Sequence, residues 1–165
     1  MEELKRVLLE SLSLKELPRA GWISKGIEKP ESVAAHSWGI AWLTMVLCPP
    51  NLDRGRILEM AALHDLAEVR VGDITPHDGI SSAEKHRMED EAMRELLEPM
   101  CHRDELKELW DEYEQGTTPE ARFLKAMDKL DMALQAQRYG GLSEFIDSAL
   151  EVLEDDLHRK LAEVS

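Results

Sequence analysis

Apolar residues recur at helical spacing along almost the whole chain. Near the N-terminus, Leu4, Val7, Leu8 and Leu12 share one face of the segment over residues 2–14, which is the spacing of an amphipathic helix. The same pattern predicts further helices over residues 31–47, 53–68, 82–97, 103–113, 119–139 and 143–161. No segment alternates apolar and polar residues as a half-buried strand would. The pattern therefore predicts an all-α fold, a bundle of six or seven helices.

Prolines, glycines and capping residues set the expected ends of these helices. Pro49 and its neighbouring proline should stop the helix over residues 31–47, and Asp53 is a suitable N-cap for the next one. Pro119 suits the first position of a later helix, and Gly140 should end it. The segments over residues 18–30 and 71–81 are rich in glycine and proline and are predicted to be loops.

Composition and net charge limit the kinds of molecule that this protein is expected to bind. A length of 165 residues suits one domain over residues 1–165, and 43% hydrophobic with 33% charged residues is typical of a soluble globular protein. The 34 acidic and 20 basic residues give a net charge of −14, which disfavours a nucleic acid polymer or an anionic membrane as partner. A small anionic substrate stays open, because a metal ion and a few basic residues can reverse the field locally.

The cysteines and the N-terminus indicate a cytoplasmic protein. Cys48 and Cys101 stand alone without CxxC spacing, so a disulfide framework or zinc knuckle is not expected. The N-terminal sequence MEELKRVLLE mixes charged and apolar residues and lacks the apolar run of a signal peptide. No segment approaches the roughly 18 apolar residues that cross a bilayer.

The first candidate for chemistry is the pair His64-Asp65 at the end of a predicted buried helix. An imidazole and a carboxylate side by side are good ligands for a divalent metal. The dipeptide alone proves little, because His77-Asp78 repeats it in the following loop, and a capping or surface role is the competing interpretation.

Nearby carboxylates favour a metal-binding role for His64-Asp65. Glu68 lies four residues after His64, and Asp73 follows in a glycine-containing turn. Three carboxylates and a histidine beside an apolar helix would repel one another without compensation. A bound cation would compensate them; a salt-bridged surface built on Arg70 is the alternative.

Two further residues could complete a metal site. His36 stands between small and aromatic residues on a helix expected to pack inside, where a satisfied core histidine is the usual meaning. Asp128 lies near the apolar stripe of its predicted helix, and a buried aspartate needs a metal or a basic neighbour. Asp131, three residues on, competes for a second role near the site or on the surface.

The order His, His-Asp and a distant Asp resembles the ligand set of the HD-domain superfamily of phosphohydrolases. Local strings narrow the resemblance to the HD-domain-containing protein 2 group, which is similar to bacterial 5′-deoxynucleotidases. These strings include LHDLAE (residues 63–68), VGDITPHDG (71–79), EKHR (84–87) and TPEARF (118–123). The resemblance runs from about Gly21 to Tyr139, which is most of the chain.

The resemblance implies a role for each candidate residue. It makes His36, His64, Asp65 and Asp128 the metal ligands. Glu68 and Asp73 would handle protons around the attacking water and the leaving oxygen, or hold a second cation. Arg19 would grip the phosphate, with Lys25 as the alternative, and Trp22 would line the sugar or base. His77, Lys85 and Arg87 could add positive charge near the site, and a surface role is the alternative for each.

A function follows from that resemblance. Two imidazoles and two carboxylates can hold manganese, cobalt, magnesium, zinc, nickel or iron, and such a metal activates water and neutralises phosphoryl charge. The expected reaction is hydrolysis of (deoxy)nucleoside 5′-monophosphates to nucleoside and phosphate. Alternatives are another HD reaction, on cyclic nucleotides, nucleoside triphosphates or alarmones, and a non-catalytic metal-binding or nucleotide-binding module. The resemblance also implies a homodimer.

Overall fold

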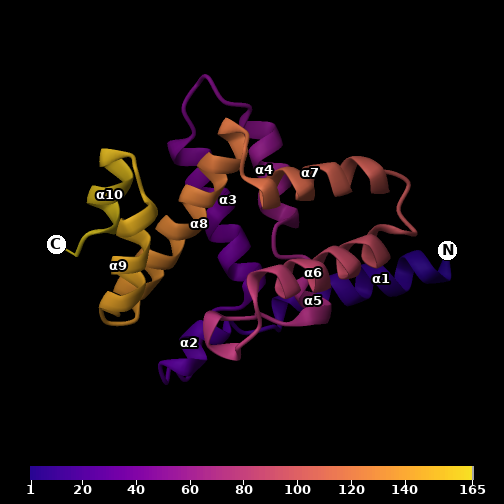
Figure 1. The fold of residues 1–165 in the computed structure, drawn as a ribbon, viewed down its shortest axis with the longest axis horizontal. Helices are drawn as coiled ribbons and strands as arrows, with labels where there is room; N and C mark the ends of the chain where they lie inside the picture. The colour runs from indigo at the N-terminus through magenta and orange to yellow at the C-terminus, as the bar shows by residue number, and fades with distance from the viewer. Residues whose placement is uncertain (165) are drawn as a thin grey trace. The chain divides into compact units, whose positions relative to one another are not determined.

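The computed structural model describes residues 1–164 and leaves Ser165, the last residue of the expected domain, outside the description. These residues form ten α-helices and two 3₁₀ turns, with no β-strand among them (Figure 1). The elements are α1 (Glu2–Leu12), η1 (Ser13–Lys15), α2 (Ala20–Ser24), α3 (Val33–Leu47), α4 (Arg54–Leu63), α5 (Glu68–Val71), η2 (Pro76–Asp78), α6 (Ser82–Leu97), α7 (Arg103–Gln115), α8 (Pro119–Arg138), α9 (Ser143–Val152) and α10 (Asp156–Ala162).

The all-α prediction is confirmed, and the number of helices is larger than the six or seven expected. Seven of the described helices have ten or more residues, namely α1, α3, α4, α6, α7, α8 and α9. The additional ones are α2, α5 and α10, with five, four and seven residues. Helices this short leave too few positions for a period of 3.6 to be visible in the sequence.

The backbone forms two compact units. The first consists of residues 1–37 and 62–111, and the second of residues 38–61 together with the chain from residue 112 onward. Helices α3, α4 and α7 each contribute to both units, since the boundaries fall within them.

In the first unit, α5 packs against α6 and η1, and α1 continues into η1 (Figure 1). Its apolar centre is a cluster of buried residues from the α5 turn, α6 and α7, namely Ala67, Ala92, Met93, Leu97 and Trp110. Arg70 on α5 donates to the carboxylate of Glu10 on α1 at 2.7 Å and also pairs with Glu95 on α6. These contacts fix the short segment that follows His64.

In the second unit, α8 packs against α9 and α10 (Figure 1). One stripe of α8 is buried along its whole length, at Ala121, Leu124, Met127, Leu130, Ala133 and Ala136. This i, i+3 spacing defines the core-facing side of a helix. Ile146 and Ala149 of α9 are buried in the same unit. This buried stripe fixes the rotation of α8 about its axis, and with it the directions in which Asp128 and Asp131 point.

Several predicted helix ends are confirmed. The hydroxyl of Thr118 accepts a hydrogen bond from the amide of Ala121 at 3.1 Å, and Pro119 occupies the first helical position of α8. Asp53 caps α4 by accepting from the amide of Arg56 at 3.1 Å. Helix α3 ends at Leu47, before the prolines.

Three predicted segments differ from the structure. The helix expected over residues 53–68 ends at Leu63, and a turn separates it from α5. The loop expected over residues 18–30 contains α2, five residues long. The last helix, expected over residues 143–161, is interrupted because Asp155 accepts from the amides of Leu157 and His158 and so begins a new helix.

None of the helices in residues 1–164 combines the length and the apolar character that a bilayer crossing requires.

Candidate metal centre

The turn after α4 presents His64 and Asp65 from a fixed backbone. The amide of Leu66 donates to the carbonyl of Leu63 at 3.0 Å, which continues the chain in a tight turn. The carbonyl of His64 accepts from the indole Nε1 of Trp110 at 3.3 Å, so the buried tryptophan of α7 holds this turn in place. His64 itself is only 5% exposed. The two candidate ligands therefore project from a turn that hydrogen bonds to Leu63 and Trp110 hold in place.

His36 on α3 joins this pair. Its Nε2 lies 3.9 Å from Oδ2 of Asp65, and Nε2 of His64 lies 3.1 Å from the same oxygen. The two imidazole centroids are 5.8 Å apart with the rings inclined at 61°. One ligand atom from each of the three residues lies within 4.8 Å of the others. The structure thus brings together three of the four predicted ligands.

This donor set fits a divalent metal. Two imidazole nitrogens and a carboxylate oxygen are the ligands that zinc, manganese, cobalt, nickel and iron accept. All three residues belong to the first unit, and both histidines are buried. Histidines packed this closely around a carboxylate are better explained by a shared cation than by a core role, because three polar groups are withdrawn from water together.

The electrostatics favour a charged Asp65. Burial on its own would raise the pKa of this carboxyl. The charge of the adjacent imidazole and its hydrogen bond, both from His64, outweigh burial, and Arg19 and His36 add to them. Together they hold the pKa of Asp65 well below its usual range, so the carboxylate is ionised as a metal ligand must be.

The pKa of Glu68 is shifted in the opposite direction from that of Asp65. It is the first residue of α5 and only 3% exposed, and its Oε2 has no hydrogen-bond partner among the described residues. Burial, followed by the nearby charges of Asp65 and Asp73, raises the pKa of Glu68 to about 9. A buried carboxyl with so high a pKa is typical of a group that handles protons.

Asp73 and Arg19 close the site on the other side. The carboxylate of Asp73 accepts from the amide of Ala20 at 2.7 Å. The guanidinium Nη1 of Arg19 lies 3.8 Å from Oδ1 of Asp73 and 3.6 Å from Oδ2 of Asp65. Arg19 therefore faces both carboxylates. Arg70, the residue of the competing surface interpretation, pairs with Glu10 and Glu95 instead.

The segment that carries Arg19 is held by Glu31, a residue that the sequence pattern did not single out. The carbonyl of Glu31 accepts from the amide of Arg19 at 3.0 Å, and its carboxylate accepts from Nε1 of Trp22 at 3.0 Å. A bridge between Pro18 and Ser32 lies beside these contacts. An acidic residue two positions before a helix start was the available signal, but it does not reveal a partner.

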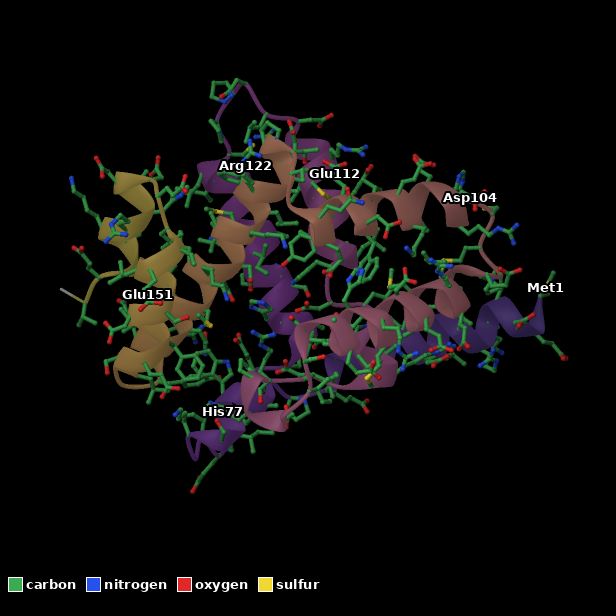
Figure 2. All side chains as sticks on the ribbon, viewed as in Figure 1. Met1, His77, Asp104, Glu112, Arg122 and Glu151 are labelled. Atoms are coloured by element: carbon green, nitrogen blue, oxygen red, sulfur yellow. The ribbon has the colours of Figure 1, made fainter. Side chains whose placement is uncertain are left out.

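The predicted substrate residues differ in their surroundings. Trp22 is 2% exposed and packs as a core residue of the first unit. His77 is exposed on η2 (Figure 2), and Lys25 is exposed after α2. Arg87 is exposed and pairs with Glu84 and Glu91.

Lys85 lies closer to the site than its position on a charged helix suggested. Its ammonium is 3.4 Å from the carboxylate of Glu89. Burial lowers the pKa of Lys85, but the charges of Glu89, Glu68 and Asp65 outweigh burial and raise it. Lys85 is therefore a permanent cation that acts on the acidic residues of the site.

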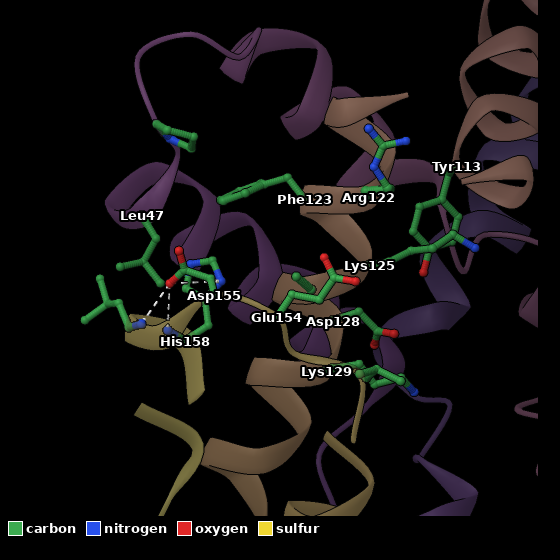
Figure 3. Close-up of a pocket in the computed structure, with 14 residues that line it drawn as sticks. Leu47, Tyr113, Arg122, Phe123, Lys125, Asp128, Lys129, Glu154, Asp155 and His158 are labelled. Carbon is green, nitrogen blue, oxygen red and sulfur yellow. Dashed lines mark hydrogen bonds and ion pairs between the residues drawn. The ribbon is translucent and has the colours of Figure 1, made fainter. Parts of the chain in front are cut away.

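Asp128, the fourth predicted ligand, belongs to the second unit. It lies on α8 beside Lys129, on the wall of a cavity of about 730 Å³ within that unit. Figure 3 shows Asp128, Lys129 and Glu154 along this wall. Its role as a ligand stays a prediction. Asp131 lies against α3, where a Cβ on Gly39 would meet its Oδ1.

Comparisons with known proteins show the family to which the chain belongs. The HD domain family model matches residues 12–164. The chain is 46% identical over 138 residues to "5'-deoxynucleotidase hdd1" of Schizosaccharomyces pombe, covering 79% of this chain and 70% of that protein. It is 42% identical over 144 residues to "5'-deoxynucleotidase HDDC2" of Homo sapiens, covering 82% and 71%.

Solved structures show the same fold. A conserved hypothetical protein from Pyrococcus furiosus superposes with a TM-score of 0.79 at 30% identity, covering 96% of this chain and 99% of that one. A predicted metal-dependent phosphohydrolase from Magnetospirillum magnetotacticum gives 0.75 at 26% identity, covering 98% and 92%. With a family model over residues 12–164 and relatives above 40% identity, the chain belongs to the HD domain family.

Proposed function

We propose that this protein is a metal-dependent 5′-deoxynucleotidase that hydrolyses (deoxy)nucleoside 5′-monophosphates to nucleoside and phosphate. The observation that carries the proposal is the buried, proton-holding Glu68 beside the cluster of His36, His64 and Asp65. A site that only bound a metal would not need such a group. The names of the curated relatives support the same activity.

In this proposal the metal is held by His36, His64 and Asp65, with Asp128 as the fourth ligand. One candidate ligand atom from each of the first three lies within 4.8 Å of the other two. Manganese, cobalt, magnesium, zinc, nickel and iron all accept mixed nitrogen and oxygen ligands. When bound, the metal lowers the pKa of a coordinated water and neutralises charge on the phosphoryl group.

Glu68 and Asp73 divide the proton transfers. Glu68 is buried beside Asp65, and in the metal-free protein burial and the neighbouring carboxylates raise its pKa. The charge of a bound cation would favour the ionised carboxylate, which could then orient the attacking water or take its proton. Asp73 is anchored by the amide of Ala20, which orients its second oxygen toward Arg19. In the proposal, Asp73 delivers a proton to the departing 5′-oxygen, directly or through water. A second cation between the two carboxylates is the alternative role.

Arg19 binds the phosphate in this proposal. Its guanidinium already faces the acidic side of the metal cluster, and a planar guanidinium matches two phosphate oxygens at once. Lys85 adds a positive charge close to Glu68 and Asp65. Trp22 and His77 remain proposed neighbours of the nucleoside. For Trp22, whose ring is buried, this role requires the α2 segment to move when substrate binds.

The test is a panel of metals against a panel of phosphate esters. Purified protein is stripped of metal, reloaded with each divalent ion in turn, and assayed for inorganic phosphate. We expect release from deoxynucleoside monophosphates with manganese or cobalt, and slower release from the ribose forms. Cyclic nucleotides and triphosphates are included, because preferential turnover of either would replace the proposed substrate class. No turnover with any metal would defeat the enzymatic proposal.

A further inference from the structure

Helix α6 buries a carboxylate that the proposed reaction does not use. Among residues 1–164, Glu68 and Glu89 are the two acidic residues that are buried. A buried carboxylate is costly unless a cation or hydrogen bonds compensate it. Oε1 of Glu89 lies 3.4 Å from the ammonium of Lys85, which stands one helical turn earlier on α6. Glu89 therefore holds the ammonium of Lys85 from inside the fold.

The pair of Lys85 and Glu89 differs from the other ion pairs of the same helix. The side chains of Lys85 and Glu89 are 35% and 11% exposed. Arg94 makes the same i, i+4 kind of pair with Asp90 at 2.9 Å, but its side chain is 70% exposed. Exposed pairs hold their side chains weakly, because water and salt compete with them. The pair withdrawn from water gives the ammonium of Lys85 a defined position.

The ammonium of Lys85 is directed at the acidic side of the metal cluster. Helix α6 packs against α5, and Glu68 is the first residue of α5 (Figure 1). The charges of Glu68 and Asp65 both act on Lys85. An ammonium carries three donors, and the pair with Glu89 needs one of them. Lys85 can therefore donate to a ligand while Glu89 holds it.

The charge balance of the first unit shows why such a donor is needed. Asp65, Glu68 and Asp73 would together carry three negative charges when a divalent metal is bound. The metal and Arg19 would supply three positive charges, so the two sets cancel. A phosphate monoester adds close to two further negative charges at neutral pH. Lys85 is the cation of the first unit that would offset part of this added charge.

We propose that Lys85 binds the phosphate of the substrate together with Arg19, and that Glu89 positions Lys85. The proposal rests on the hydrolysis of nucleoside monophosphates proposed above. Lys85 touches the substrate, whereas Glu89 acts only by holding the ammonium in place. A lysine ammonium is a compact point charge and complements the planar guanidinium of Arg19 at a phosphate group.

The test is Lys85→Met, which keeps the length of the side chain and removes its charge. We expect the dissociation constant of inorganic phosphate, measured by calorimetry on manganese-loaded protein, to rise by about 10- to 100-fold. KM for a deoxynucleoside monophosphate should rise in parallel, with a smaller change in kcat. The variant should keep its metal, because the loss of a nearby cation does not weaken the binding of another cation.

Arg94→Met is the matched control, since it removes one positive charge from an exposed pair on the same helix. It should leave the phosphate affinity and KM unchanged. If Lys85→Met fails to fold because Glu89 is left uncompensated, the double variant Lys85→Met with Glu89→Gln removes both charges and should show the same loss of phosphate affinity.

Glu89→Gln alone tests the positioning role. It should raise KM less than Lys85→Met does and leave kcat nearly unchanged. A Glu89→Gln protein that lost stability but kept its KM would show that Glu89 does not position Lys85. A folded Lys85→Met protein with wild-type affinity for phosphate would overturn the proposal. If wild-type protein hydrolysed no ester, the proposed function would fail, but the phosphate titration would still test Lys85.

Discussion

Nε2 of His64 lies 3.1 Å from Oδ2 of Asp65, the residue that follows it in the chain. Adjacent residues on a regular helix point about 100° apart, so this approach requires the turn that replaces the helix after Leu63. The turn thus brings the side chains of this His-Asp dipeptide together as candidate ligands. The second pair, His77-Asp78, is exposed, and its aspartate instead caps η2 by accepting from Thr75.

Replacing Asp65 with alanine should abolish phosphate release. The change removes the one carboxylate that both imidazoles of the cluster face, so we also expect loss of tightly bound metal, measured by elemental analysis after gel filtration. Asp104→Ala is the control, because that carboxylate is 92% exposed. Full turnover in Asp65→Ala would show that this residue is not an essential metal ligand.

Glu68→Gln should keep its metal and lose most of its rate. The amide preserves the shape of the side chain but cannot take up a proton, and a positioned acid or base contributes about 10²- to 10⁴-fold. The measurements are metal content and kcat for a deoxynucleoside monophosphate. If the variant lost its metal as well, Glu68 would have to be counted among the ligands.

The same substitution should stabilise the metal-free protein in a pH-dependent way. The pKa of Glu68 is about 9 in the folded chain and about 4.3 in an unfolded one. Between these values the folded state binds more protons, so the free energy of unfolding falls as the pH rises, by at most about 1.4 kcal/mol per pH unit. Glutamine does not ionise, so the Glu68→Gln variant should not lose this part of its free energy of unfolding as the pH rises.

Thermal melts in the presence of a chelator therefore check the raised pKa. We expect Glu68→Gln to melt at a higher temperature than wild-type protein at pH 8 and at a similar temperature near pH 4.5. A difference between the two proteins that did not change with pH would contradict a protonated Glu68.

Arg19→Lys should raise KM for a monophosphate substrate more than it lowers kcat. Lysine keeps the positive charge but cannot pair with two phosphate oxygens, and the difference is worth roughly tenfold in affinity. Lys25→Ala is the matched change at the alternative cation, which is exposed, and it should leave KM unaltered. The reverse pattern would assign the phosphate to Lys25.

Gly39→Ala should destabilise the second unit. Alanine normally stabilises a helix interior relative to glycine by about 1 kcal/mol. Here the new Cβ would clash with Oδ1 of Asp131, and overpacking of this kind costs about 1–3 kcal/mol. Urea denaturation measures the change. The double variant Gly39→Ala with Asp131→Ala should recover most of the loss, because it removes the atoms that clash.

Long helices were predictable and their interruptions were not. Helix α6 spans Ser82–Leu97 as the spacing indicated, because Ser81 caps it and a regular apolar stripe continues to its end. The break before α10 depends on Asp155, whose side chain competes with the helix for two backbone amides. In the sequence, Asp155 stands among other acidic residues and cannot be recognised as a capping residue, so one helix was predicted over residues 143–161.

In the site, buried histidines were easier to anticipate than the cations around them. His36 was expected inside the fold, and it is 1% exposed. For the phosphate, Arg19 was the first candidate in the sequence and Lys25 the alternative, and both lie in a glycine- and proline-rich segment. In the structure, Glu31 holds the segment of Arg19 by accepting from the amide of Arg19 and from the indole of Trp22. Contacts of this kind depend on tertiary structure and cannot be predicted from the spacing of residues in the sequence.

The position of Arg19 has a consequence for how the protein matures. Its guanidinium stands 3.6 Å from Asp65 and 3.8 Å from Asp73, so positive charge already balances these carboxylates as the chain folds. We therefore expect newly made protein to reach its folded state before it encounters a metal ion. Metal loading would then be a separate, reversible event, governed by the supply of ions.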